Sequence, residues 1–142
     1  MKTSKELLDN LLKTTQMGQT GIRSVIDAPM RPALRQALES QLREYDAIEQ
    51  EAQDIMRRRN WPASQADPVV QGLSAMVSRA KLSYGNTDSK IASMMIQGNT
   101  KGLVKGLRNL HRSDRKDSRV DTLSQKLIDT ETNNIRQMRP FL

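Results

Sequence analysis

Four long segments of the chain repeat apolar residues every three or four positions, which is the spacing of one face of an α-helix. They span about residues 4–26, 32–59, 88–110 and 117–138. A shorter segment, about 67–83, has the same spacing and begins with Asp67-Pro68, a favourable N-cap and first helical residue. Pro29 and Pro32 separate the first two long segments, and no segment has the alternation of a strand. The pattern predicts an all-α chain.

The first and third long segments resemble each other. Met17-Gly18-Gln19-Thr20 in the first is echoed by Gln97-Gly98-Asn99-Thr100 in the third. A duplicated helical hairpin favours an up-down four-helix bundle. We therefore expect one domain over residues 1–142, with hairpins at 4–59 and 88–138 and an additional helix at 67–83 between them.

Polar residues interrupt the apolar stripe of each long helix near its middle. These residues are Thr15, Gln19, Gln41, Tyr45, Asn99, Glu131 and Asn134. Projected together, they form one layer across the centre of the predicted bundle. We interpret the layer as a hydrogen-bonded device that fixes the register of the helices. A small-ligand site and one weakly bound ion are the alternatives.

The same layer is poor in metal ligands. A di-iron carboxylate site needs about four inward Glu residues, with Glu-x-x-His on two helices. The chain offers Glu44-x-x-Ala47 and Glu131-x-x-Asn134, and the first and third helices have no carboxylate in their middles. Its one histidine, His111, falls at a predicted helix end, and no nucleophile stands beside a base. The sequence predicts no metal centre, no cofactor and no enzymatic activity.

Three glycines stand four residues apart in the third long helix: Gly98, Gly102 and Gly106. Each interior Gly costs roughly 0.5–1 kcal/mol relative to Ala. The stripe therefore predicts close packing against another helix, either the 67–83 helix or a second subunit, so that a homodimer is one expectation. A kink at a functional bulge is the alternative.

The third long helix is also basic. On the side opposite Leu103 and Leu107, which we expect to face inward, it carries a stack of four cations: Lys101, Lys105, Arg108 and Arg112. The chain as a whole has a net charge of +7. Such a stack either complements the helix dipole on a solvated face or binds phosphate groups. We keep weak binding of nucleic acid or another polyanion as an alternative function.

Composition narrows the class of protein further. Hydrophobic residues make up 36% of the chain and aromatics 3%, which suits a helical core of aliphatic residues. Eight Met residues suit gap filling in such a core. The absence of Cys excludes disulfides and thiol chemistry. No apolar run is long enough to span a membrane and none resembles a signal peptide, so a cytoplasmic location is expected.

Several short motifs resemble ferritin-like four-helix-bundle proteins of unknown function. They are Leu11-Leu12 to Gly21-Ile22, Gln71-Gly72-Leu73 with Arg79 to Leu82, Ile91 to Gly98, and Ile135-Arg136-Gln137-Met138-Arg139. In that family a Gly followed by an acid tends to mark the first and third helices. The matching positions here, Gln19 and Asn99, are amides. The resemblance implies a ferritin-like fold whose metal site is absent or degenerate.

A second resemblance, to ferritin-like spore-coat proteins, covers about a tenth of the chain. It rests on Met56 to Pro62 and on Ala66-Asp67-Pro68. Together these features predict a non-catalytic structural or interaction module. The alternatives are polyanion binding through the third helix and a residual metal-binding or spore-coat-type protein.

Overall fold

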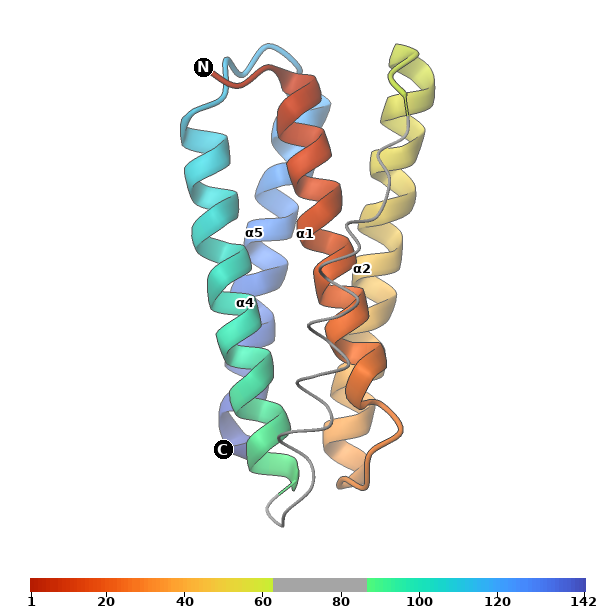
Figure 1. Ribbon diagram of the computed structural model, residues 1–142, viewed down its shortest axis with the longest axis vertical. Helices are drawn as coiled ribbons and strands as arrows, with labels where there is room; N and C mark the ends of the chain where they lie inside the picture. The colour runs from red at the N-terminus through yellow and green to blue at the C-terminus, as the bar shows by residue number, and fades with distance from the viewer. Residues whose placement is uncertain (63–86) are drawn as a thin grey trace.

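The computed structural model describes residues 1–62 and 87–142, and this part of the chain is helical (Figure 1). Helix α1 spans Ser4–Val25, α2 spans Pro32–Arg59, α4 spans Thr87–His111 and α5 spans Ser118–Met138. A 3-10 turn, η1, covers Arg139–Phe141. These bounds agree with the four long helices predicted from the sequence to within a residue or two. The predicted helix at 67–83 lies outside the described residues.

The helices form a bundle, and ion pairs at its two ends show how α2, α4 and α5 run relative to one another. Arg31, before α2, donates to Asp88 at the start of α4 over 2.6 Å, so α2 and α4 begin at the same end. Arg59 at the end of α2 donates to Asp117 before α5 over 2.8 Å, so these helices are antiparallel. Each hairpin, α1–α2 and α4–α5, runs up and down as predicted (Figure 1). Because α2 and α4 are parallel, however, the directions do not alternate through all four helices.

The core is aliphatic and follows the predicted stripes of α1, α2 and α5. Leu8, Leu12 and Ile22 of α1 are buried. The inward positions that the helical spacing predicts for the next and the last helix are buried as well: Leu34, Leu38, Gln41, Tyr45, Ile48, Ala52 and Ile55 of α2, and Val120, Leu123, Leu127, Glu131, Asn134 and Met138 of α5. Tyr45 is the largest fully buried side chain among the described residues. One isolated backbone bridge, Lys2 with Ser113, joins the start of the chain to the α4–α5 loop, and no strand forms in the described ranges. No helix in these ranges is long and apolar enough to cross a membrane.

The rotation of α4 differs from the prediction in its second half. Leu107, expected inside, is exposed, and Leu103 is only partly buried. Asn109 is buried instead, and Gly106 faces α5. A helix with small residues on one side can approach its neighbour closely along that side, which turns larger side chains outward.

Two of the three glycines of α4, Gly102 and Gly106, pack against α5, a neighbour that the sequence did not indicate. A Cβ on Gly102 would lie 3.2 Å from the carboxyl carbon of Glu131, and one on Gly106 would lie 3.3 Å from Ile128. The close neighbour of these two glycines among the described residues is thus another helix of the same bundle, and packing against the 67–83 helix or a second subunit stays a prediction. A Cβ on Gly98 would meet no atom within 4 Å among the described residues.

Helix ends are secured by side chains suited to them. Thr3 and Glu6 form a reciprocal capping box at the start of α1. Asp117 caps α5 by accepting from the backbone amides of Arg119 and Val120. Asn60 ends α2 with φ 57°, a left-handed conformation that Asn tolerates better than most residues.

Candidate functional site

All seven residues of the predicted polar layer are buried at the centre of the bundle. Their exposed fractions are at most 6%. They come from all four long helices because each of these helices has a polar residue where its apolar stripe crosses the bundle midpoint. Glu44, which the sequence analysis weighed as a possible metal ligand, is exposed. The layer is therefore made of amides, hydroxyls and one carboxylate, that of Glu131.

Four of the seven residues form a connected cluster around the Tyr45 hydroxyl, which we call the Tyr45 cluster. The hydroxyl oxygen lies 2.9 Å from Asn99 Oδ1 and 3.0 Å from Glu131 Oε1. Asn134 Nδ2 donates to the same hydroxyl over 3.1 Å. Tyr45 thus joins α2 to both α4 and α5 through a single oxygen atom.

The number of protons in the Tyr45 cluster favours a protonated Glu131. A phenol has one proton, so Tyr45 can donate either to Asn99 or to Glu131. If Glu131 carries a proton and donates to Tyr45, Tyr45 can donate to Asn99, and all three contacts are hydrogen bonds. Burial raises the pKa of Glu131 to about 8, although the hydrogen bond from Tyr45 opposes the shift. Burial, and then the Glu131 charge, raise the pKa of Tyr45 far above its usual range.

The other three residues of the layer bond elsewhere, so the layer is not one network. Thr15 donates to the carbonyl of Leu11 in its own helix, over 2.8 Å. Gln19 donates to Asp46 over 2.8 Å. Gln41 likewise donates to Gln137, over 2.9 Å. Asp46 and Gln137 lie on the outer sides of α2 and α5, outside the buried faces of these helices.

Two glycines make room for the Tyr45 cluster. A Cβ on Gly18 of α1 would lie 2.5–2.9 Å from ring atoms of Tyr45, and Gly102 of α4 stands against the Glu131 carboxyl group. Gly18 was not among the predicted site residues. Its place in the Met17-Gly18-Gln19-Thr20 motif was the available signal, but the motif alone does not say what the glycine touches. Close packing, rather than open space, therefore surrounds the central side chains on these two sides.

The centre does not fit a ferritin-type metal site. No group of three or more His, Cys, Asp or Glu residues that could hold a metal ion occurs in residues 1–62 and 87–142. Glu131 Oε2 and Asn134 Oδ1 are buried without a hydrogen-bond partner in this part of the chain, but they supply a single carboxylate. One carboxylate cannot balance the charge of two divalent ions. His111 is exposed at the end of α4, about three helical turns after Asn99 of the Tyr45 cluster.

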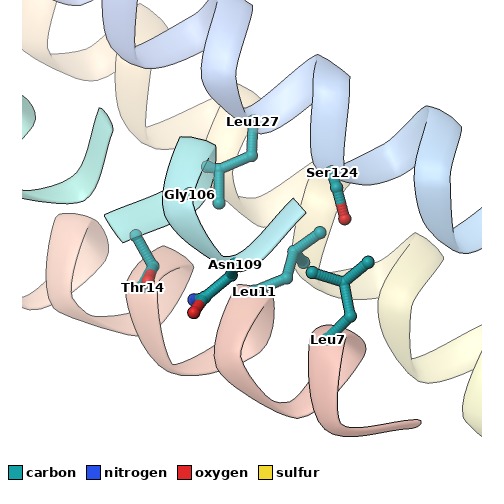
Figure 2. A pocket seen from close by; sticks show the side chains of 7 residues that line it. All are labelled: Leu7, Leu11, Thr14, Gly106, Asn109, Ser124 and Leu127. Carbon is teal, nitrogen blue, oxygen red and sulfur yellow. The ribbon is translucent and has the colours of Figure 1, made fainter. Parts of the chain in front are cut away.

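A small cavity lies nearer the end of the bundle, between α1, α4 and α5 (Figure 2). Its volume is about 10 Å³, close to what one water molecule requires. Thr14, Asn109 and Ser124 give it polar groups, and Ser124 Oγ has no hydrogen-bond partner in the described ranges. The cavity is large enough for hydration of this serine and too small for an organic ligand.

The predicted anion-binding residues are exposed on the outer side of α4. All four side chains of the stack, Lys101, Lys105, Arg108 and Arg112, face solvent. Val104 and Leu107 of the same helix are also exposed, which the sequence did not indicate. The four cations lie on one helix, and none of them lines the small cavity between α1, α4 and α5, so they form an exposed row along α4.

Comparison with protein families, with curated proteins and with solved structures finds no match to this chain. The site is therefore interpreted from its own geometry.

Proposed function

We propose that the protein is a non-catalytic, ferritin-like helical bundle that acts as a structural or interaction module. The observation that carries this proposal is the composition of the bundle centre. Where a ferritin-type enzyme needs several carboxylates and histidines, this chain has Tyr45, Asn99 and Asn134 around one carboxyl group. Such a cluster holds helices in register and offers nothing that activates a substrate.

The order of helix directions supports the ferritin-like part of the proposal. Ferritin-like bundles have two antiparallel hairpins whose middle helices are parallel and are joined by one long crossover connection. Here α2 and α4 are parallel, and they end and begin at opposite ends of the bundle (Figure 1). A simple alternating bundle would place those ends together.

The proposal is tested by the metal content and iron chemistry of the protein. Protein purified without chelator, then incubated with ferrous iron under air and desalted, should hold no stoichiometric iron or manganese by elemental analysis. It should also oxidise ferrous iron no faster than a buffer control. Two tightly bound equivalents of iron, or ferroxidase turnover abolished by Glu131→Gln, would overturn the proposal.

A further inference from the structure

The exposed cations of α4 have no anionic partner within the described part of the protein. Elsewhere in these ranges seven arginines form ion pairs with aspartates: Arg23, Arg31, Arg57, Arg58, Arg59, Arg115 and Arg119. By contrast, no hydrogen bond or ion pair within the described residues engages the four side chains of the cation stack, Lys101, Lys105, Arg108 and Arg112. The stack is therefore available to an anion from outside the chain.

The cation stack is a straight row along the helix. Its members follow one another at intervals of four, three and four residues, so they fall within about 60° around the helix axis and extend about 16 Å along it. The helix dipole favours cations only within the last turn. Lys101 and Lys105 stand ten and six residues before His111, the last residue of α4, so the dipole does not account for them.

The structure shows which side of α4 carries the stack. Asn109 faces α1, because it lines the small cavity together with Thr14 (Figure 2). Lys105 and Arg112 lie four residues before and three residues after Asn109, so they occupy the neighbouring strip of the helix surface. In α1 no Asp or Glu occurs between residues 10 and 26. The helix on this side of the stack therefore offers no carboxylate to neutralise it.

Lys2 adds a cation at the end of the stack. Its backbone amide donates to the carbonyl oxygen of Arg112 over 2.8 Å. Asp114, in the adjoining loop, is the carboxylate closest in sequence, and it accepts from the hydroxyl of Ser4 and from the backbone amide of Lys116. The fold thus brings a lysine from a distant part of the sequence to the row of α4.

We propose that the cation stack of α4 binds the phosphate backbone of a nucleic-acid duplex. This inference rests on the proposed function, because it names the partner of the interaction module. One strand of a duplex has about one phosphate per 3.4 Å of its axis, so a row about 16 Å long faces about five phosphates. The row and a strand therefore match in length and in number of charges. Because contacts to phosphates carry no sequence information, the binding is indifferent to base sequence.

The shape of the stack favours a duplex over other partners that carry phosphates. Helix α4 has no aromatic residue, so the bases of a single strand have nothing to stack on. A bilayer surface binds a helix through aliphatic side chains as well as cations. Of the two exposed aliphatics of α4, Val104 borders the stack, whereas Leu107 points about 100° or more away from all four cations.

The test is the salt dependence of binding to a fluorescently labelled DNA duplex of about 20 base pairs, measured by anisotropy between about 50 and 200 mM salt. Four phosphate contacts predict a log–log slope of the association constant near −3 to −4. Two duplexes of unrelated sequence should bind within about two-fold of each other. No saturable binding at the lowest salt would overturn the inference.

Two double variants separate the stack from net charge. Lys105→Gln with Arg108→Gln should make the slope shallower by about two units and weaken binding roughly 10- to 100-fold at the lowest salt. The matched control, Arg43→Gln with Lys126→Gln, removes the same charge from exposed sites on α2 and α5 and should change the slope by less than about half a unit. Equal losses in the two double variants would overturn the inference, since they would show that only net charge matters.

Leu107→Gln separates a duplex from a membrane surface. It keeps the charge and should leave duplex binding within about two-fold, because this side chain is turned away from the stack. The competing arm uses phosphatidylcholine vesicles with about one-third phosphatidylserine. Vesicle binding tighter than duplex binding at the same salt, and weakened by Leu107→Gln, would assign the helix to a bilayer and overturn the inference.

Failure of the duplex test is distinguishable from failure of the proposed function. A protein that binds neither duplex nor iron loses only the nucleic-acid inference. A protein that binds two equivalents of iron loses the proposed function whatever the duplex shows.

Discussion

Glu131 is the residue on which the centre of the bundle depends most. It is the one carboxylate of the polar layer, it contacts Tyr45, and it packs against Gly102. Burial raises its pKa to about 8 from an ordinary value of 4.5. The folded protein therefore holds a proton that the unfolded chain releases in mildly acidic solution. The ionisation of Glu131 therefore makes the free energy of unfolding depend on pH.

The stability of the wild-type protein relative to Glu131→Gln should consequently fall as pH rises from about 5 to about 8. Below this window both proteins carry a neutral group at position 131 and should be nearly equal. Above it the wild type must either ionise a buried carboxyl group or unfold, and it should be less stable by roughly 2–5 kcal/mol. Urea denaturation at several pH values measures the difference. Parallel stability curves would mean that Glu131 ionises at its ordinary pKa and is open to water.

A Glu131→Leu substitution separates charge from hydrogen bonding. Leucine has no polar atom for Tyr45 and must fit against Gly102. Relative to Glu131→Gln at neutral pH, we expect a loss of about 1–3 kcal/mol in the free energy of unfolding. Equal stability of the two variants would show that the Tyr45 cluster does not depend on this partner.

At the scale of elements, the sequence predicted the bounds of all four long helices and the buried face of three of them. Pro32 and Asn60 bracket α2, and its period is strictly helical, so both its bounds and its buried face follow from sequence. The buried face of α4 was harder to predict, because either Leu103 and Leu107 or Gly102 can face inward, but not both. Hydrophobic periodicity favours the leucines, whereas the close approach to α5 favours the glycine, and that approach depends on the position of Glu131 in another helix.

The same limit applies to the polar layer. Its seven members could be predicted because each interrupts an apolar stripe. Two of their hydrogen-bond partners, Asp46 and Gln137, could not be predicted. They lie on sides of their helices where the sequence pattern indicates ordinary solvent-exposed surface. The role of Gly18 could not be predicted for a related reason. Only the structure shows that the ring of Tyr45 packs against this glycine.

Gly18 and Gly98 occupy equivalent places in the sequence repeat and provide a matched pair. Gly18→Ala should destabilise the protein by about 1–3 kcal/mol, because the new methyl group collides with a buried ring held by its hydroxyl. Gly98→Ala meets no described atom within 4 Å and should stabilise it by about 0.5–1 kcal/mol through helix propensity. Chemical denaturation of both variants measures the contrast. Stabilisation by Gly18→Ala would contradict the placement of Tyr45 against α1.

The α2–α5 junction gives a second test at this scale. Arg59 holds both carboxylate oxygens of Asp117, and this contact lowers the pKa of Asp117 although partial burial opposes the shift. Asp117→Ala should cost about 0.5–2 kcal/mol by removing the cap of α5, and Asp117→Asn should cost less because an amide oxygen still caps.

The pH dependence of Asp117→Asn identifies the ionic part of that contact. A lowered folded-state pKa contributes stability above the ordinary value of 3.8 that is lost as pH falls through the folded-state value. The wild type should therefore exceed Asp117→Asn in stability at neutral pH and lose this advantage as the pH falls from the ordinary value of 3.8 through the lower folded-state pKa. An advantage that persists unchanged in strong acid would show that the Arg59 contact is not ionic in origin.

At the scale of the whole molecule, two asymmetries define the protein. Helices α1 and α4 lack carboxylates in their middles and carry the exposed aliphatics and the cation stack, whereas α2 and α5 carry most of the acidic groups. The helix directions place α2 and α4 parallel in a bundle whose centre has one carboxyl group. Together they describe a bundle that has a basic outer surface on α4 and a closely packed centre.

Anomalous diffraction from crystals soaked in ferrous iron tests the central claim most directly. The account predicts no anomalous peak near Glu131 in a map calculated from data at the iron edge, and a Tyr45 hydroxyl that stays in contact with Asn99. A peak about 2.0–2.2 Å from a Glu131 carboxylate oxygen, with Tyr45 displaced to admit it, would contradict the account and make the bundle centre a metal site.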